Sequence, residues 1–291
     1  MSRSFLFVPG DSERKLAKAR GAGADALIID LEDSVLRSEL PEARTRTRDF
    51  LTSLPGPECW VRINPLDSAD ALQDLRETLP GKPAGIVLPK PAAAADVVTL
   101  GNLLAGLEQE HGIAAGTTRI LPIVTERPEA LFRLHEYAGA SARLAALAWG
   151  AEDLAAALGA SANRDAVGNW LPPYQLARSL CLLAAAAAAV PAIDTVYTDF
   201  KDSAGLARYA ADARRDGFRG MLAIHPDQVA VINAAFMPDP REIEHAKKVV
   251  ALFAGNPQAG TLSLDGRMID RPHLVQARRI LQFADHGPAT E

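Results

Sequence analysis

Acidic side chains follow three of the short apolar runs in this sequence, and basic side chains follow two others. The acids are Glu32, Asp33, Glu126 and Asp153, and the bases are Arg62 and Lys90. Two or three carboxylates that converge without a cysteine or histidine cluster favour an oxygen-preferring ion, Mg²⁺ or Mn²⁺. An arginine beside such an ion suits a substrate carboxylate, because its planar guanidinium can donate two parallel hydrogen bonds. The pattern therefore indicates metal-assisted chemistry on a 2-oxo or 2-hydroxy acid.

Each of these acids also has a structural interpretation. Glu126 could cap a helix that starts at Pro128. Asp153 could be a first-turn acid that the helix dipole stabilises. Spacing alone leaves both interpretations open.

The same holds for the remaining members of the set. Arg62 and Lys90 could be structural partners of the acids in segment 30–33. Glu32 and Asp33 are more often supporting groups than direct metal ligands. The residues alone do not decide between a site and a set of ion pairs.

Eight short apolar runs alternate with longer segments of helical spacing. The runs cover residues 5–8, 26–30, 60–63, 85–88, 120–124, 145–148, 195–197 and 220–224. Most are continuously apolar, as expected for parallel strands covered on both faces. Eight strand–helix units predict an α/β protein with a closed (β/α)₈ TIM barrel, and an open doubly wound sheet is the alternative. In a barrel, catalytic groups collect at the carboxyl ends of the strands, where the acids and bases stand.

The pattern changes after the eighth unit. Residues 239–242 combine a capping aspartate, a first-turn proline and an acid, which together favour a helix start. Residues 254–266 are rich in Gly, Pro and Ser and predict an exposed connection, and a last helix is expected at about 272–284. We therefore expect a catalytic barrel at 1–238 and a C-terminal helical extension at 239–291 that acts as a lid.

Composition excludes several classes of protein. The net charge of −5 argues against a nucleic-acid-binding surface. The longest apolar stretch, 180–190, is well below the roughly twenty residues that cross a bilayer, and run 5–8 is too short for a signal peptide. Cys59 and Cys181 form no disulfide framework and no metal-spaced pair, which suits a reducing compartment. We expect a cytoplasmic protein that binds neither nucleic acid nor membranes.

Seven motifs occur in an order that resembles one known family. They are F-L-F-V-P-G (5–10), D-L-E-D-S-V (30–35), R-I-N-P (62–65), L-P-K (88–90), W-G-A-E-D-L (149–154), D-F-K-D (199–202) and A-I-H-P-D-Q (223–228). Together they resemble the citrate lyase β-subunit-like branch of the HpcH/HpaI aldolase superfamily, which also contains malyl-CoA and citramalyl-CoA lyases. The resemblance extends over essentially the whole chain.

This resemblance implies a TIM barrel that assembles as a homotrimer or homohexamer. It implies Mg²⁺ bound by Glu126 and Asp153, with Glu32 and Asp33 behind them orienting metal-bound water. Arg62 would bind the carboxylate and carbonyl oxygen of the oxo acid. The implied reaction cleaves or forms a 3-hydroxyacyl-CoA, such as malyl-, citramalyl- or citryl-CoA, with an acyl-CoA and a 2-oxo acid as products.

Three further residues take roles from the resemblance. Asp270, in the motif at 265–273, would come from the lid of a neighbouring subunit and act as acid or base on the thioester enolate. Lys90 would be an electrostatic or CoA-contacting group. Arg164, in the loop after the sixth strand, could contact a CoA phosphate or be a solvated loop arginine.

The resemblance leaves other activities open. A citrate lyase β-subunit would act on a thioester tethered to a carrier protein. A malyl-CoA thioesterase would release free CoA. A non-catalytic barrel would bind CoA or an oxo acid without turnover.

Overall fold

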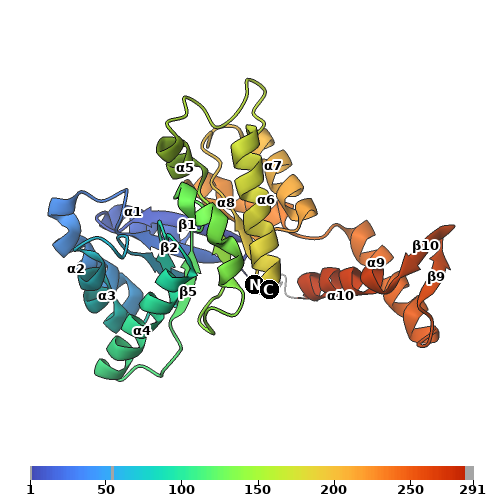
Figure 1. Ribbon diagram of the computed structural model, residues 1–291, viewed down its shortest axis with the longest axis horizontal. Coiled ribbons are helices and arrows are strands. Elements are labelled where there is room, and N and C mark those ends of the chain that lie inside the picture. Colours follow the sequence, from blue (N-terminus) through green and yellow to red (C-terminus); the bar gives the residue numbers. More distant parts are fainter. Residues whose placement is uncertain (1, 54–55, 286–291) are drawn as a thin grey trace. The chain divides into compact units, whose positions relative to one another are not determined.

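Eight parallel strands form the centre of the larger of two compact units, Ser2–Asn233 (Figure 1). The computed structural model describes residues 2–53 and 56–285. The strands are β1 (Ser4–Pro9), β2 (Ala26–Asp30), β3 (Glu58–Arg62), β4 (Gly85–Leu88), β5 (Arg119–Pro122), β6 (Leu147–Ala148), β7 (Ala192–Asp194) and β8 (Gly220–Ala223).

The strands close into a barrel. Their order is β5-β4-β3-β2-β1-β8-β7-β6, and parallel bridges join the two ends of this sheet, Ile120 to Leu144 and Ile123 to Ala148. The backbone N–H of Val124 also donates to the carbonyl of Ala148 at 2.8 Å. The predicted (β/α)₈ barrel is confirmed, and the open doubly wound sheet is wrong because β5 and β6 are bridged.

Helices follow the strands and cover the outside of the barrel. They are α1 (Glu13–Arg20), α2 (Leu40–Thr52), α3 (Ala71–Thr78), α4 (Ala94–Glu110), α5 (Ala151–Leu158), α6 (Pro172–Ala187), α7 (Ser203–Asp216) and α8 (Pro226–Ala235), with 3₁₀ helices η1 (Arg37–Glu39), η2 (Leu79–Gly81) and η3 (Pro128–Tyr137). In Figure 1, α2, α3 and α4 lie on one side of the strands, and α6 and α7 lie on the other. Ser12 caps α1 and Asp202 caps α7, each by accepting a backbone N–H of the first turn.

The apolar strands supply the core of the barrel. All five residues of β2 are buried, and side chains such as Phe5, Trp60 and Leu121 fill the interior. Gly85 makes room for Trp60, since a Cβ at that position would lie 2.2 Å from the indole ring. Polar groups are thereby left to the strand ends.

The strand predicted at 195–197 lies three residues too late, because β7 covers Ala192–Asp194. Residues 195–197 have the β-branched and aromatic types that favour strands, yet β7 pairs through Ala192 and Ile193. Both side chains are buried in the core. Burial and register against the neighbouring strands outweigh the local preference. Residues 195–197 instead begin the loop at the carboxyl end of β7.

The second unit contains Ala234–Glu291 and has a core of its own. Its elements, orange to red in Figure 1, are α9 (Pro240–Gly255), β9 (Thr261–Leu264), β10 (Arg267–Asp270) and α10 (Arg271–Asp285). The buried side chains are Ala246, Val249, Phe253, Ile269, Leu274 and Ala277. The predicted start of α9 is present as a capping box between Asp239 and Glu242. The boundary at 238/239 and the lid function stay predictions.

The connection predicted at 254–266 is partly wrong. It contains β9, which pairs antiparallel with β10. Asp265 and Gly266 form the turn, with φ of 50° and 76°. Asp-Gly is a preferred pair for such two-residue turns because both positions need positive φ. Within the described residues, no helix combines the length and apolar character needed to cross a bilayer.

Candidate active site

A cavity of about 340 Å³ lies at the carboxyl ends of the barrel strands. Its floor is apolar, with side chains that include Phe7, Ile123, Trp149 and Leu222. Its polar lining includes Asp30, Asp33, Arg62, Glu126, Glu152 and Asp153. Parallel strands bring their ends to one face, so groups far apart in the sequence meet here.

Arg62 is the most firmly held side chain of the site. Its Nε and Nη2 donate to Asp30 Oδ1 and Oδ2 at 2.6 and 2.8 Å. The two residues are register partners on β3 and β2. Asp30 in turn accepts the backbone N–H groups of Glu32 and Ser34, both at 3.1 Å. This fixes the guanidinium plane and directs Nη1 toward the remaining acids.

Glu32 and Asp33 lie next to that free edge of the guanidinium. Arg62 Nη1 is 3.0 Å from Glu32 Oε2 and 3.6 Å from Asp33 Oδ2. The buried Oε2 atom makes an ion pair there but no hydrogen bond of good geometry. The Glu32 side chain is 5% exposed and that of Asp33 is 56% exposed. Glu32 therefore belongs to the buried part of the site and Asp33 to its rim.

Lys90 lies among the same carboxylates. Its Nζ forms an ion pair with Glu32, and it lies 3.3 Å from Asp33 Oδ1 and 3.1 Å from Asp153 Oδ1. Its backbone has φ of 51°, the left-handed conformation that side chains other than glycine rarely adopt. This conformation accompanies a backbone N–H that donates to Glu126 Oε2 at 2.6 Å. Lys90 thus contacts acids through both ends, with its ammonium group as a positive charge and with its backbone N–H as a hydrogen-bond donor.

Glu126 is buried and packs against a glycine. A Cβ at Gly150 would lie 2.8 Å from Glu126 Cγ, so this approach requires glycine. The cap of η3 is Arg127, and no side-chain hydrogen bond caps that helix. The helix-cap interpretation of Glu126 therefore fails, because its carboxylate accepts from Lys90 instead. Asp153 stands in the first turn of α5, as its structural interpretation has it, and it also reaches Lys90. Its role as a metal ligand stays a prediction.

The acids of this site outnumber its cations. We call Asp30, Glu32, Asp33, Glu126 and Asp153, with Arg62 and Lys90, the acidic cluster. Burial raises the pKa of Glu126 to about 8, and the charges of Asp153 and Glu32 add to the shift. Burial likewise raises the pKa of Glu32 to about 6, against the influence of Arg62 and Lys90. Burial opposes the charge on Lys90, but the surrounding carboxylates raise its pKa. A further positive charge would relieve this repulsion.

The donor set fits a magnesium ion. Within residues 2–53 and 56–285, no three His, Cys, Asp or Glu side chains form a ready metal cage. Mg²⁺ does not need one, because it commonly takes one or two carboxylates and completes its shell with water and substrate oxygens. Among the neighbouring charges that raise the pKa of Glu126, the charge of Asp153 has the largest effect. Oxygen donors with uncompensated negative charge suit a hard divalent ion.

Two predicted site residues lie outside the acidic cluster. Arg164 stacks on Trp170, with its guanidinium carbon 3.4 Å from the ring centroid, and its Nη1 donates to the carbonyl of Gly168 at 2.7 Å. It is therefore not the freely solvated loop arginine of the alternative, and its phosphate contact stays a prediction. Asp270 belongs to the second unit, at the end of β10, with its Oδ1 2.6 Å from His273 Nδ1. Its catalytic role also stays a prediction.

The structural interpretation of Arg62, as a partner of an acid in segment 30–33, is confirmed for Asp30, which is its register partner across β2 and β3. Sequence reasoning missed Asp194. Asp194 ends β7 and was hidden by the misplaced strand. It is fully buried and accepts hydrogen bonds from Trp149 and Tyr209. The available signal was an acid directly after the apolar pair Ala192-Ile193.

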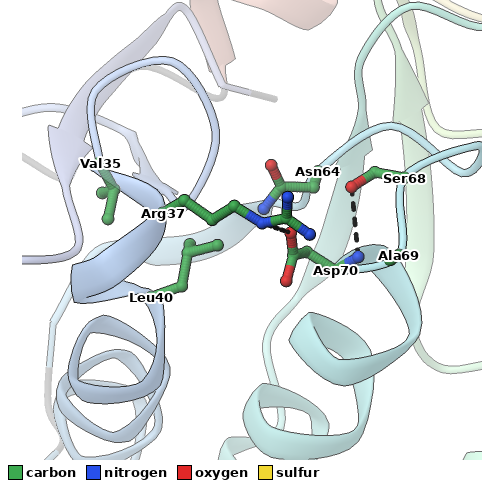
Figure 2. A pocket seen from close by; sticks show the side chains of 7 residues that line it. All are labelled: Val35, Arg37, Leu40, Asn64, Ser68, Ala69 and Asp70. Carbon is green, nitrogen blue, oxygen red and sulfur yellow. Dashed lines mark hydrogen bonds and ion pairs between the residues drawn. The ribbon is translucent and has the colours of Figure 1, made fainter.

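A second cavity, of about 370 Å³, lies beside the segments that follow β2 and β3 (Figure 2). Its polar side chains already bind one another. Arg37 Nε lies 3.0 Å from Asp70 Oδ2, and the backbone N–H of Asp70 donates to Ser68 Oγ at 3.2 Å. Asn64 donates to Asp74 Oδ2 at 2.8 Å. These contacts hold the loop that follows Arg62, and they favour a structural role.

Comparisons with known proteins agree with this geometry. The family model described as HpcH/HpaI aldolase/citrate lyase matches residues 3–226. A (3S)-malyl-CoA thioesterase of Cereibacter sphaeroides is 34% identical over 287 residues, covering 97% of this chain and 94% of that protein. The citrate lyase subunit beta of Escherichia coli K12 is 36% identical over 290 residues, covering 97% and 93%.

Solved structures show the same relationship. The protein CitE from Mycobacterium tuberculosis, in complex with magnesium, acetoacetate and coenzyme A, superposes with a TM-score of 0.81. It is 34% identical, and the match covers 98% of both chains. A citrate lyase beta subunit from the same organism, complexed with oxaloacetate and magnesium, gives a TM-score of 0.70 at 36% identity, covering 81% of this chain and 97% of that one.

Proposed function

The chain belongs to the HpcH/HpaI aldolase/citrate lyase family, and from this premise we propose that it is a Mg²⁺-dependent carbon–carbon lyase. Its substrate would be a 3-hydroxyacyl-CoA such as malyl-, citramalyl- or citryl-CoA. Cleavage would yield acetyl-CoA or another acyl-CoA together with a 2-oxo acid, and the reverse reaction would join them. Relatives crystallised with magnesium, coenzyme A, acetoacetate and oxaloacetate support these ligand classes.

The observation that carries the proposal is the acidic cluster above an apolar floor. Buried carboxylates at this density are costly unless a cation binds them, and Glu126 bears most of that cost. Arg62 adds a positive edge 3.0 Å from Glu32 Oε2, held in place by Asp30. A small acid with two adjacent oxygens matches one metal and one guanidinium. The cavity of about 340 Å³ has room for such a fragment.

The roles of the chain's own groups follow from this arrangement. Glu126 and Asp153 would hold Mg²⁺, which supplies a Lewis acid that makes a substrate hydroxyl easier to deprotonate and stabilises the carbonyl that forms. Arg62 would stabilise the same oxygen through Nη1, because its other two nitrogen donors are bound to Asp30. Glu32 and Asp33 would orient metal-bound water. Lys90 would contribute charge near the thioester.

The second fragment leaves as a thioester enolate and must gain a proton at carbon. We propose Asp270 as that acid, contributed by the C-terminal unit of a neighbouring subunit in a trimer or hexamer. Mixing Asp270→Asn subunits with Arg62→Ala subunits should restore activity that neither variant has alone. Failure of every mixed sample to cleave substrate would contradict the shared site.

The decisive experiment follows the products. The purified chain is incubated with malyl-, citramalyl- and citryl-CoA, with Mg²⁺ or with EDTA, and 2-oxo acid, acyl-CoA and free thiol are measured separately. Equal amounts of oxo acid and acyl-CoA, formed only with Mg²⁺, are expected. The reverse screen uses glyoxylate, pyruvate and oxaloacetate with acetyl- and propionyl-CoA. Activity found only on a carrier-bound thioester would favour a citrate lyase subunit instead.

A thioesterase is the second candidate, favoured by the 34% identical (3S)-malyl-CoA thioesterase. The same site could position water against the thioester carbonyl rather than cleave a carbon–carbon bond. Free thiol without glyoxylate, from malyl-CoA, would identify this activity. Glyoxylate release at the same rate as malyl-CoA consumption, without free thiol, would exclude it.

A further inference from the structure

The strand that leads to Asp153 is the shortest in the barrel. β6 has two residues, against three in β7 and four or more in the others. It pairs with β7 only through Leu147 with Ala192 and Ala148 with Ile193. Its contact with the β5 side consists of isolated bridges, such as Ile123 with Ala148. Few backbone hydrogen bonds, such as that from Val124 N–H to the Ala148 carbonyl, therefore restrain this strand, although a proposed metal ligand follows it.

A side chain supplies the missing restraint. Trp149 comes directly after β6, is fully buried, and forms part of the cavity floor. Its Nε1 donates to Asp194 Oδ1 at 2.6 Å. Its ring packs edge-on against Trp170, with centroids 5.1 Å apart. The indole is thus held both by a hydrogen bond to β7 and by an aromatic contact to the loop before α6.

Asp194 is itself rigidly held. Its Oδ1 also accepts from the backbone N–H of Thr195 at 2.8 Å and from Tyr209 at 2.9 Å. Its Oδ2 accepts from Arg178 Nε and Nη2 at 3.0 and 2.8 Å. The side chain is fully buried. A carboxylate with donors on both oxygens from three elements can serve as a fixed anchor.

The anchor connects to both proposed metal ligands. Gly150, the residue after Trp149, packs against Glu126 so closely that a Cβ would lie 2.8 Å from its Cγ. The backbone N–H of Gly150 donates to Thr125 Oγ1 at 3.1 Å. Asp153 follows within the first turn of α5. A shift of Trp149 would move the Gly150 wall against Glu126 and the helix start that carries Asp153.

We propose that Asp194, acting through Trp149, is a positioning residue that sets the separation of the carboxylates of Glu126 and Asp153. The inference rests on the metal-binding part of the proposed function. Asp194 touches neither metal nor substrate in this assignment. Supporting groups of this kind typically change metal affinity by about 10- to 100-fold when removed.

The test is the Mg²⁺ affinity of the full chain, measured by isothermal titration calorimetry. Trp149→Phe removes the N–H donor and keeps an aromatic ring against Trp170. The dissociation constant for Mg²⁺ should rise about tenfold. The matched control is Tyr209→Phe, which removes a different donor to the same Asp194 oxygen but lies on α7. Its Mg²⁺ affinity should stay within about twofold of the parent. Its melting temperature should fall about as much as that of Trp149→Phe, because each variant removes one hydrogen bond to Asp194.

Two results would overturn the inference. One is an unchanged dissociation constant in Trp149→Phe, and the other is an equal loss in both variants. If Trp149→Phe does not unfold cooperatively, the double variant Asp194→Leu/Arg178→Met replaces it, because it removes the acceptor without leaving a buried charge. The same tenfold loss is expected there, and parental affinity would contradict the inference. Loss of Mg²⁺ binding in Asp153→Ala with retention in Trp149→Phe would reject this inference alone. Absence of binding in the parent would reject the metal site itself.

Discussion

At the amino end of the barrel, Glu108 and Asp25 each have an arginine of their own, whereas the five carboxylates of the acidic cluster at the carboxyl end share two cations. At the amino end, where β5 and β6 begin, Arg143 donates to both oxygens of the fully buried Glu108, at 2.7 and 2.6 Å. Asp25, just before β2, accepts two side-chain hydrogen bonds from Arg3. At the carboxyl end, Arg62 and Lys90 are divided among the whole acidic cluster.

The pKa shifts express this difference. Burial alone would raise the pKa of Glu108, but hydrogen bonds from Arg143 and from the N–H groups of Gly116 and Thr118 lower it to about 2. The pKa of Glu126 moves the other way, to about 8, because burial and the neighbouring acids are not compensated. The amino end is thus arranged for stability. The carboxyl end keeps unfavourable repulsion that a divalent cation would relieve, as is common where function and stability compete.

The largest effect is expected from Glu126→Gln. Loss of a metal-binding carboxylate should lower Mg²⁺-dependent cleavage by about a thousandfold. The melting temperature in EDTA near pH 7 should rise, because Glu126, with its pKa raised to about 8, must take up a proton on folding and glutamine removes that cost. Initial rates and thermal unfolding in EDTA test both parts. A variant with parental activity, or with a lower melting temperature, would break the contrast between the two ends.

The mirror-image change is Glu108→Gln at the amino end. It leaves Arg143 buried with a neutral partner, which should cost about 3 kcal/mol of unfolding free energy. Urea unfolding measures this loss. The kcat and the Mg²⁺ affinity of the folded fraction should match the parent, since Glu108 lies at the opposite end of the barrel from the acidic cluster. A tenfold change in either quantity would show that the two ends are coupled.

The loss of unfolding free energy at acid pH should also depend on Glu108. Its folded pKa of about 2 lies below the ordinary value of 4.5, so its contribution is present above pH 4.5 and is lost as the pH falls toward 2. By linkage, about 2 kcal/mol should disappear between about pH 5.5 and 3. Urea unfolding at several pH values measures this loss. In the control Glu108→Gln, the unfolding free energy should fall by about 2 kcal/mol less over the same pH range. Parallel curves would contradict the assignment.

At both ends, the sequence predicts the strands and helices better than the ion pairs between them. The apolar runs predict the barrel and the face on which Arg62, Glu126 and Asp153 meet, because parallel burial leaves a continuous apolar signature. Pairing across the barrel has no such signature. The partners Asp30–Arg62 and Glu108–Arg143 are 32 and 35 residues apart, and their pairing depends on register.

The same limit explains two particular errors. Residues 195–197 look more like a strand than Ala192–Asp194, and only the neighbours' register decides between them. The hairpin around Asp265-Gly266 is four residues on each side, so its alternation is too short to outweigh the surrounding Gly and Ser. Residue types predict strands and helices well where a run of residues is continuously buried. They predict them poorly where a short segment takes its conformation from the strand it pairs with.

The smallest effect is expected from Lys90→Met, which can be compared with a lysine at the other end of the same strand, β4. Lys90 follows β4 with φ of 51°, and Lys82 precedes it with φ of 56°, so the two lysines share type and backbone conformation at opposite ends. Lys90→Met removes one of the two cations of the acidic cluster. The dissociation constant for Mg²⁺ should fall about fivefold, because the remaining carboxylates attract a divalent ion more strongly. The metal-free protein should melt at a lower temperature, because its carboxylates repel one another more strongly without this cation.

Lys82→Met is the matched control and should leave Mg²⁺ affinity unchanged. Calorimetric titration decides: weaker binding in Lys90→Met would mean that Lys90 holds Asp153 in place for the metal rather than competing with it.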